Sequence, residues 1–268
     1  MIKLQNIFTK KPLPTFLFDQ RPVNLWTTCK RAIYMHSRND LRNKSVLIIG
    51  DDDLTSLAIA FLDIATNITV IDVDERLISY INTISEEYRL NIRAIKVNLL
   101  KEFPKELKKS FDVFTTDPTP QKKPFEIFVK SGIECLKDHS GVGYVSFFPS
   151  HQDISIDFQK VLTDNNCIIT DMIPKFTEYD FIEHTYSEED LTKLKMVDTN
   201  ERKLSFHENI TRFVIGKRYK ELASSKQFSG KATTKVLQDL SKDPAYHSAD
   251  RAYIEKIAQE MLKENDQI

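Results

Sequence analysis

The feature that most constrains the fold is a short apolar run, Val46–Ile49, followed at once by a glycine, three aspartates and a helical stretch. Such a run, bounded by turn-forming residues, is typical of a buried parallel strand. Residues 54–65 are typical of the helix after it, so the loop between them lies at the carboxyl end of the strand. Ligands bind at that end in open α/β sheets.

The same alternation continues along the chain and predicts the fold class. Further strands are predicted at 68–72, 92–97, 111–116, 143–148, 167–173 and 209–215, and helices at 22–37, 75–88, 125–136 and 154–162. Strands that alternate with helices imply a mostly parallel sheet with right-handed crossovers. We therefore predict an α/β, Rossmann-like fold of the class I S-adenosylmethionine-dependent transferases, with seven strands and 209–215 as an antiparallel edge. Residues 1–20 are predicted to be irregular, with a short strand at 16–18.

The charge of the first loop limits the class of ligand that it can bind. Asp51, Asp52 and Asp53 would repel a phosphate, and Gly50 by itself does not make the glycine-rich turn of a dinucleotide site. The three carboxylates, which we call the acidic loop, suit a cation such as the sulfonium of an S-adenosyl compound or an amine. The alternative is an acidic helix start that the helix dipole favours.

Two further strand ends carry candidate nucleoside ligands. Asp72 ends the second predicted strand about 20 residues after Gly50, where a carboxylate commonly accepts hydrogen bonds from ribose hydroxyls. Asp74 follows two residues later and is assigned to the same ligand. Asn98, at the end of the third strand, is placed to meet an adenine edge, with a turn residue as the alternative.

Asp117 is the catalytic candidate, because it ends the fourth strand over the expected cleft. An attacking amine must lose a proton before it becomes nucleophilic, and a carboxylate at this point can accept it. Pro118 fixes the backbone beside it and borders the nucleoside. The alternative is an ordinary Asp-Pro turn.

The segment 174–208 combines acids with aromatic rings and is predicted to form the acceptor side of the cleft. Carboxylates and aromatic faces together bind a chain of ammonium groups. A solvated connector is the alternative. The residues assigned to substrate binding here are Glu178, Tyr179, Asp180 and Glu183.

Composition narrows the class of protein. Residues 1–44 hold nine Lys or Arg against two Asp, a net charge of +7. The formal net charge of the whole chain is −1, so the remaining residues carry a net charge of −8. No apolar run approaches the roughly 18 residues of a membrane span, and the three cysteines lie far apart without metal-site spacing. We expect a cytoplasmic protein with no metal and no membrane partner, and nucleic acid is not expected despite the basic start. A homodimer is compatible with these features.

Several motifs together resemble a known family, the branched-chain polyamine synthases or N4-bis(aminopropyl)spermidine synthases. They occur in order over residues 16–216: F-D-Q at 18–20, M-H-S-R-N-D-L at 35–41, G-D-D-D-L-T-S at 50–56, D-V-D-E-R-L at 72–77, F-T-T-D-P at 114–118 and K-F-T-E-Y at 175–179.

The resemblance implies transfer of aminopropyl groups from decarboxylated S-adenosylmethionine to an amine of spermidine, with methylthioadenosine as the other product. It implies that Asp117 is the catalytic aspartate and that Asp72 and Asp74 lie on the nucleoside side. Gln20, in F-D-Q, is assigned to the substrate. The predicted organisation is an N-terminal extension or cap at 1–44, a catalytic domain at 45–216 and a polar, helical tail at 217–268.

The chain also departs from the family pattern. The family usually has D-P-P-E where this chain has D-P-T-P at 117–120, and an aspartate where Asn98 stands. The missing second acid keeps an alternative open, in which intact S-adenosylmethionine donates a methyl or aminocarboxypropyl group to a small amine. A non-catalytic protein that binds polyamine or nucleic acid is a third hypothesis.

Overall fold

The structure is a computed structural model that describes residues 2–21, 23–101, 103–119, 121–137, 140–147, 152–179 and 206–216. Residues 1–216 form one compact unit. The N-terminal 44 residues belong to that unit, and the proposed division into extension, catalytic domain and tail stays a prediction. No helix among the described residues is long and apolar enough to cross a membrane.

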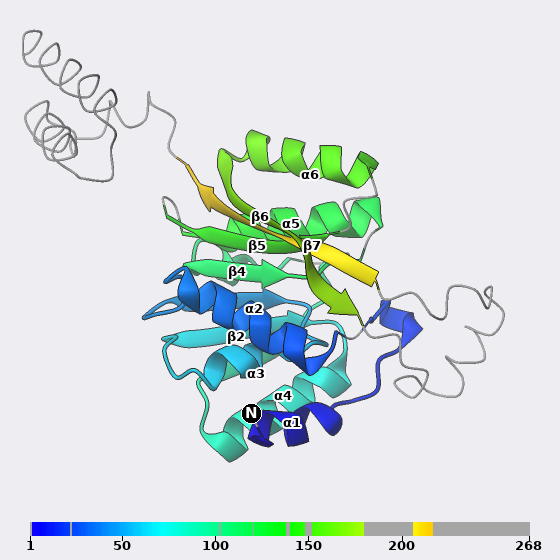
Figure 1. Ribbon diagram of the computed structural model, residues 1–268, viewed down its shortest axis with the longest axis vertical. Coiled ribbons are helices and arrows are strands. Elements are labelled where there is room, and N and C mark those ends of the chain that lie inside the picture. Colours follow the sequence, from blue (N-terminus) through cyan, green and yellow to red (C-terminus); the bar gives the residue numbers. More distant parts are fainter. Residues whose placement is uncertain are drawn as a thin grey trace, which may run out of the picture. The chain divides into compact units, whose positions relative to one another are not determined.

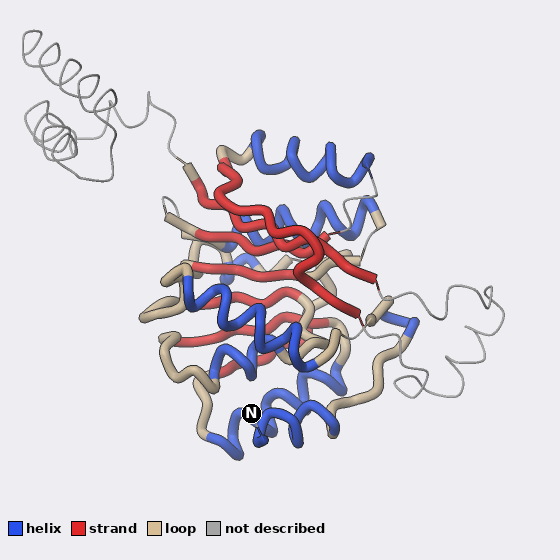
Figure 2. The backbone as a smooth tube through the Cα atoms, in the orientation of Figure 1, coloured by secondary structure: helices blue, strands red, loops and turns tan. Residues whose placement is uncertain are grey.

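The described residues form one seven-stranded sheet with the order β3-β2-β1-β4-β5-β7-β6, and Figure 2 shows its strands lying side by side. The strands are β1 Ser45–Ile49, β2 Asn67–Asp72, β3 Ile92–Lys96, β4 Val113–Thr116, β5 Val142–Phe147, β6 Cys167–Tyr179 and β7 Phe206–Ile215. The first five pair in parallel, whereas β7 runs antiparallel to both of its neighbours. The predicted fold class is therefore confirmed.

Helices cover both faces of this sheet and divide the core in two. They are α1 Ile2–Thr9, α2 Leu25–Ser37, α3 Thr55–Ala60, α4 Glu75–Tyr88, α5 Lys122–Cys135 and α6 Gln152–Asp164. Apolar residues of α1 to α4 form one buried cluster with one face of the strands, and those of α5 and α6 form the other. Alternate residues of β1 join different clusters, as the pleat requires. Figure 1 shows α2 lying across the front of the strands.

Two expectations for the first 20 residues are wrong. Ile2–Thr9 is helical, because Leu4 and Ile7 form an apolar pair at helical spacing that packs into the first core cluster. Residues Phe16–Phe18 form a 3₁₀ turn, η1, in place of a strand. The Thr15 side chain caps this turn by accepting a hydrogen bond from the Leu17 amide.

The expectations for the last two strands are partly wrong. β7 is antiparallel, as predicted, but it lies between β5 and β6, so β6 forms the edge. β6 also continues past its expected end at Ile173 to Tyr179. The pairing shifts register between Ile173 and Thr177, where Lys175 has a φ of 52° and its amide donates to the Asn209 side chain. This bulge absorbs Pro174, which has no N–H to donate to a ladder.

Candidate active site

A cavity of about 520 Å³ opens at the carboxyl ends of the parallel strands. The turn η1 contributes to its wall, together with the loops that follow β1 to β4. Of the residues predicted from the sequence, these line it: Gln20, Gly50, Asp52, Asp72, Asn98, Asp117, Pro118 and Tyr179. The strand ends therefore bring together side chains far apart in the sequence, as expected for this sheet edge.

The acidic loop gives its three carboxylates different surroundings. Asp52 lines the cavity, whereas Asp51 and Asp53 are buried beneath it. Asp51 accepts hydrogen bonds from the Ser56 amide at the start of α3, and burial raises its pKa to about 8. Gly50 starts the turn with a φ of 74°, a conformation that L-residues rarely adopt. Of the three acids in the predicted cation site, only Asp52 therefore lines the cavity, and the other two are buried.

Asp72 joins two loops at the cavity wall. Its Oδ2 accepts a hydrogen bond of 3.0 Å from the Asp51 amide, and its Oδ1 accepts one of 2.8 Å from the Asp74 amide. Burial raises the pKa of this carboxyl above its ordinary value, against the effect of the two amides. Both oxygens retain free lone pairs, so the side chain can also accept hydrogen bonds from ligand hydroxyls.

Asp74 is not among the residues that line the cavity. Its carboxylate caps α4 through the Arg76 amide and pairs with the Arg76 guanidinium at 2.7 Å. The Gln20 amide donates to the same carboxylate at 3.1 Å, while Gln20 itself lines the cavity. Asp74 therefore meets the cavity through Gln20, and its direct contact with a nucleoside stays a prediction.

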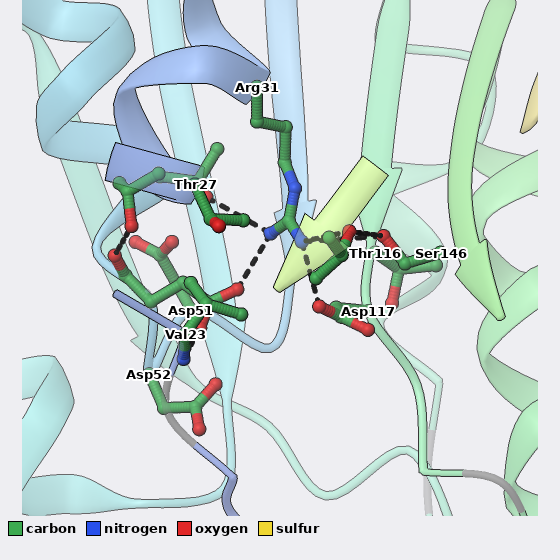
Figure 3. A network of polar contacts seen from close by, with 12 residues as sticks. Val23, Thr27, Arg31, Asp51, Asp52, Thr116, Asp117 and Ser146 are labelled. Carbon is green, nitrogen blue, oxygen red and sulfur yellow. Dashed lines mark hydrogen bonds and ion pairs between the residues drawn. The ribbon is translucent and has the colours of Figure 1, made fainter. Parts of the chain in front are cut away.

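The sequence reasoning missed Arg31, a buried arginine on α2 that lies between two loops (Figure 3). Its Nη1 pairs with Asp53 Oδ2 at 2.6 Å and its Nη2 with Asp117 Oδ2 at 2.7 Å. Burial disfavours the charged guanidinium, but the two carboxylates outweigh it and raise the pKa of Arg31. A signal was present in the sequence, because Arg31 stands on the same helical stripe as the buried Thr27 and Met35.

Asp117 stands at the centre of a network of side chains from four elements. It follows β4, its side chain is 12% exposed, and it lines the cavity. Besides Arg31, it accepts a hydrogen bond of 2.8 Å from the Tyr179 hydroxyl of β6. The same hydroxyl lies 2.8 Å from Glu208 Oε2 of β7, a residue that the sequence reasoning also missed. No sequence signal marked Glu208, because β7 was expected at the edge and beginning only at Asn209.

The remaining predicted residues differ in their placement. Asn98 lines the cavity, but its Oδ1 already accepts a hydrogen bond from the Leu100 amide within the turn. Glu178 does not line the cavity, and its carboxylate lies 3.9 Å from His207 on the far side of the strand from Tyr179. Asp180 and Glu183 lie outside the described residues. Their assignments to ligands stay predictions.

The charge of the wall limits what it can bind. Among its lining residues, five acids (Asp19, Asp52, Asp72, Asp117 and Glu208) stand against one basic side chain, Arg21. Such a cavity favours cations and repels carboxylates or phosphates. Within the part of the chain that the structure describes, no group of three or more His, Cys, Asp or Glu side chains is arranged to hold a metal ion.

A family model described as the branched-chain polyamine synthase A C-terminal domain matches residues 1–239 of the chain. The chain belongs to this family. The resemblance of the branched-chain polyamine synthase motifs noted from the sequence is thereby confirmed, and it extends over the elements that build the cavity.

Relatives of the branched-chain polyamine synthase family support the same assignment. The chain is 36% identical over 183 residues to the N(4)-bis(aminopropyl)spermidine synthase of Methanocaldococcus jannaschii, covering 66% of this chain and 52% of that protein. It is 37% identical, with the same coverage, to the enzyme of that name from Thermococcus kodakarensis. The chain thus spans about half the length of the curated relatives it matches.

A solved structure shows the fold of the family. It is the branched-chain polyamine synthase from Thermus thermophilus in complex with N4-aminopropylspermidine and 5′-methylthioadenosine. The TM-score is 0.69 at 24% identity, over 80% of this chain and 62% of that one.

Proposed function

We propose that this chain moves aminopropyl groups from decarboxylated S-adenosylmethionine to an amine of a spermidine-like polyamine. The products would be a branched polyamine and methylthioadenosine. The single observation that carries this proposal is the acid-lined cavity at the carboxyl ends of the strands, with Asp72 and Asp117 on its wall. The names of the relatives support it, as do the two molecules bound in the Thermus thermophilus structure.

The chemistry assigns roles to the acids. The amine lone pair attacks the methylene beside the sulfonium, a C–N bond forms, and the C–S bond breaks with its electron pair going to sulfur. A secondary ammonium must first lose a proton, and Asp117 would accept it. Asp72 would accept hydrogen bonds from the ribose hydroxyls, with Gly50 and Pro118 bordering the nucleoside. Gln20 and Tyr179, which line the same cavity, would meet the substrate.

The electrostatics favour the decarboxylated donor over S-adenosylmethionine itself. The decarboxylated form carries only positive charges, whereas the intact form adds a carboxylate. The acidic side chains on the wall outnumber the basic ones and would repel that carboxylate, and Arg31 is already paired with Asp53 and Asp117. Pro120 stands where the family pattern has its second acid, and the wall still carries Asp52, Asp72 and Glu208 besides Asp117.

The test is an assay of product formation by the full chain. Incubation with decarboxylated S-adenosylmethionine and spermidine should release methylthioadenosine and lengthen the polyamine, both measured by chromatography. Calorimetry should show weaker binding of S-adenosylmethionine than of its decarboxylated form. Absence of methylthioadenosine with every polyamine tried would overturn the proposal. Tighter binding of the intact form would favour a methyl- or aminocarboxypropyltransferase.

A further inference from the structure

Glu208 places a second carboxyl group directly beside Asp117. In the pairing of β6 with β7, Glu208 is opposite Thr177, so the two side chains lie on one face of the sheet. Tyr179 lies two residues beyond Thr177 and shares that face. Arg31 reaches the same face from α2 and donates to the Thr177 hydroxyl at 3.4 Å. The antiparallel insertion of β7 therefore delivers Glu208 to the cavity wall.

Among the described residues, no basic side chain lies within ion-pair distance of Glu208, so an ionised Glu208 would lack a cationic partner. The Tyr179 hydroxyl has one proton but lies 2.8 Å from both Asp117 and Glu208, so it donates to only one of them at a time. Arg31 pairs with Asp117 and Asp53. Within the described residues Glu208 forms no ion pair of its own, although its residue is only 3% exposed and lines the cavity.

We propose that Glu208 and Asp117, bridged by the Tyr179 hydroxyl, form the subsite that binds the reacting ammonium group of the acceptor. This inference rests on the proposed function and adds to it a carboxyl group that no sequence motif marked. An ammonium placed between the two carboxylates would replace the missing partner of Glu208 and could donate to both. Asp117 and Glu208 both line the cavity.

The subsite can also take up the proton that the acceptor ammonium loses. Two carboxyl groups in contact cannot both stay ionised, so the free pair shares one proton. Burial, followed by the charge of Asp117, raises the pKa of Glu208 well above its ordinary range, so Glu208 holds that proton. The other groups that face Glu208 are Tyr179 of β6 and Arg31 of α2; its neighbour His207 lies against Glu178 instead.

The proton balance then follows. When a secondary ammonium binds, the shared proton leaves to solvent and both carboxylates contact the ammonium. The ammonium next gives one proton to the pair, and the neutral amine attacks the methylene beside the sulfonium. One ammonium and one sulfonium thus yield one tertiary ammonium, one thioether and one released proton. The two carboxyl groups return to their starting state after each transfer.

The test uses the full chain, with methylthioadenosine present at saturation and spermidine as the probe. Titration calorimetry in two buffers of different ionisation enthalpy gives both the affinity and the number of protons released. Wild type should release about one proton per spermidine below the raised pKa of Glu208. Glu208→Gln keeps the shape of the side chain and an oxygen that can accept from Tyr179. This variant should bind spermidine about 10- to 100-fold more weakly, and the number of protons released on binding should fall to near zero. Its affinity for methylthioadenosine should be unchanged.

The matched control is Glu86→Gln, which makes the same change at an exposed position on α4 away from the cavity. It should bind spermidine and release protons as wild type does. Equal spermidine affinity and proton release in Glu208→Gln and wild type would overturn the subsite, even if methylthioadenosine is formed. Absence of methylthioadenosine, together with proton-linked spermidine binding that depends on Glu208, would refute the proposed function and keep the subsite. Absence of spermidine binding by wild type would overturn the subsite.

Discussion

Replacing Arg31 with methionine tests whether one buried cation holds the two acidic loops together. Its Nη atoms lie 2.6 Å and 2.7 Å from carboxylate oxygens of Asp53 and Asp117, and the three side chains are 4%, 5% and 12% exposed. Removing one member of a buried ion pair costs about 3–5 kcal/mol, because the remaining charge is left without a partner. Arg31→Met leaves two such carboxylates, so we expect a loss at the upper end of this range.

The pH dependence of this loss has a defined sign. Burial raises the pKa of Asp53 above its ordinary value even with Arg31 present, and removing the guanidinium raises it further. A carboxyl group whose pKa is higher in the folded than in the unfolded chain destabilises the fold as it ionises. The variant should therefore recover stability as the pH falls, and its deficit relative to wild type should shrink toward acid pH.

The assay is urea unfolding followed by circular dichroism, with the midpoint compared at equal m-value. Arg38→Met is the control, because Arg38 follows the same helix and pairs with Asp171 at 3.2 Å while its side chain is 43% exposed. An exposed pair contributes at most about 1 kcal/mol. If Arg31→Met loses no more stability than Arg38→Met, or if its deficit grows toward acid pH, the reasoning about Arg31 is refuted.

Three further variants test the individual acids. Asp117→Asn should bind methylthioadenosine normally and turn over about 10²- to 10⁴-fold more slowly, with partial recovery at higher pH; near-normal turnover would leave Asp117 as a turn residue. Asp51→Asn should remove a stability loss that wild type suffers as the pH rises from about 4 toward about 8, because the carboxyl ionises in the unfolded chain while the buried one stays protonated; parallel urea midpoints across this range would contradict it. Asp74→Ala should lower the free energy of unfolding by about 1–2 kcal/mol, because α4 loses its cap, and a midpoint unchanged from wild type would show that the cap contributes nothing.

The sequence by itself determined the parallel part of the sheet and the place of the cavity. Apolar runs and helical stripes are local patterns, and parallel strands with right-handed crossovers have few ways to assemble. Their carboxyl ends must share an edge, so the sequence alone assigns Asp52, Asp72 and Asp117 to one cavity. The motifs around these acids also sufficed to place the chain in its family.

Only the tertiary structure decided which acids face the ligand. Whether a carboxylate points into a cavity or caps a helix depends on turn geometry and on side chains elsewhere in the chain. The sequence therefore does not show which of two adjacent aspartates, such as Asp51 and Asp52, lines the cavity. Glu208 reaches Asp117 only because β7 inserts beside β5, a pairing between residues 62 to 72 positions apart in the sequence. Arg31 likewise contacts loops that lie 22 and 86 residues away. Such contacts follow from register and long-range packing, which local periodicity does not specify.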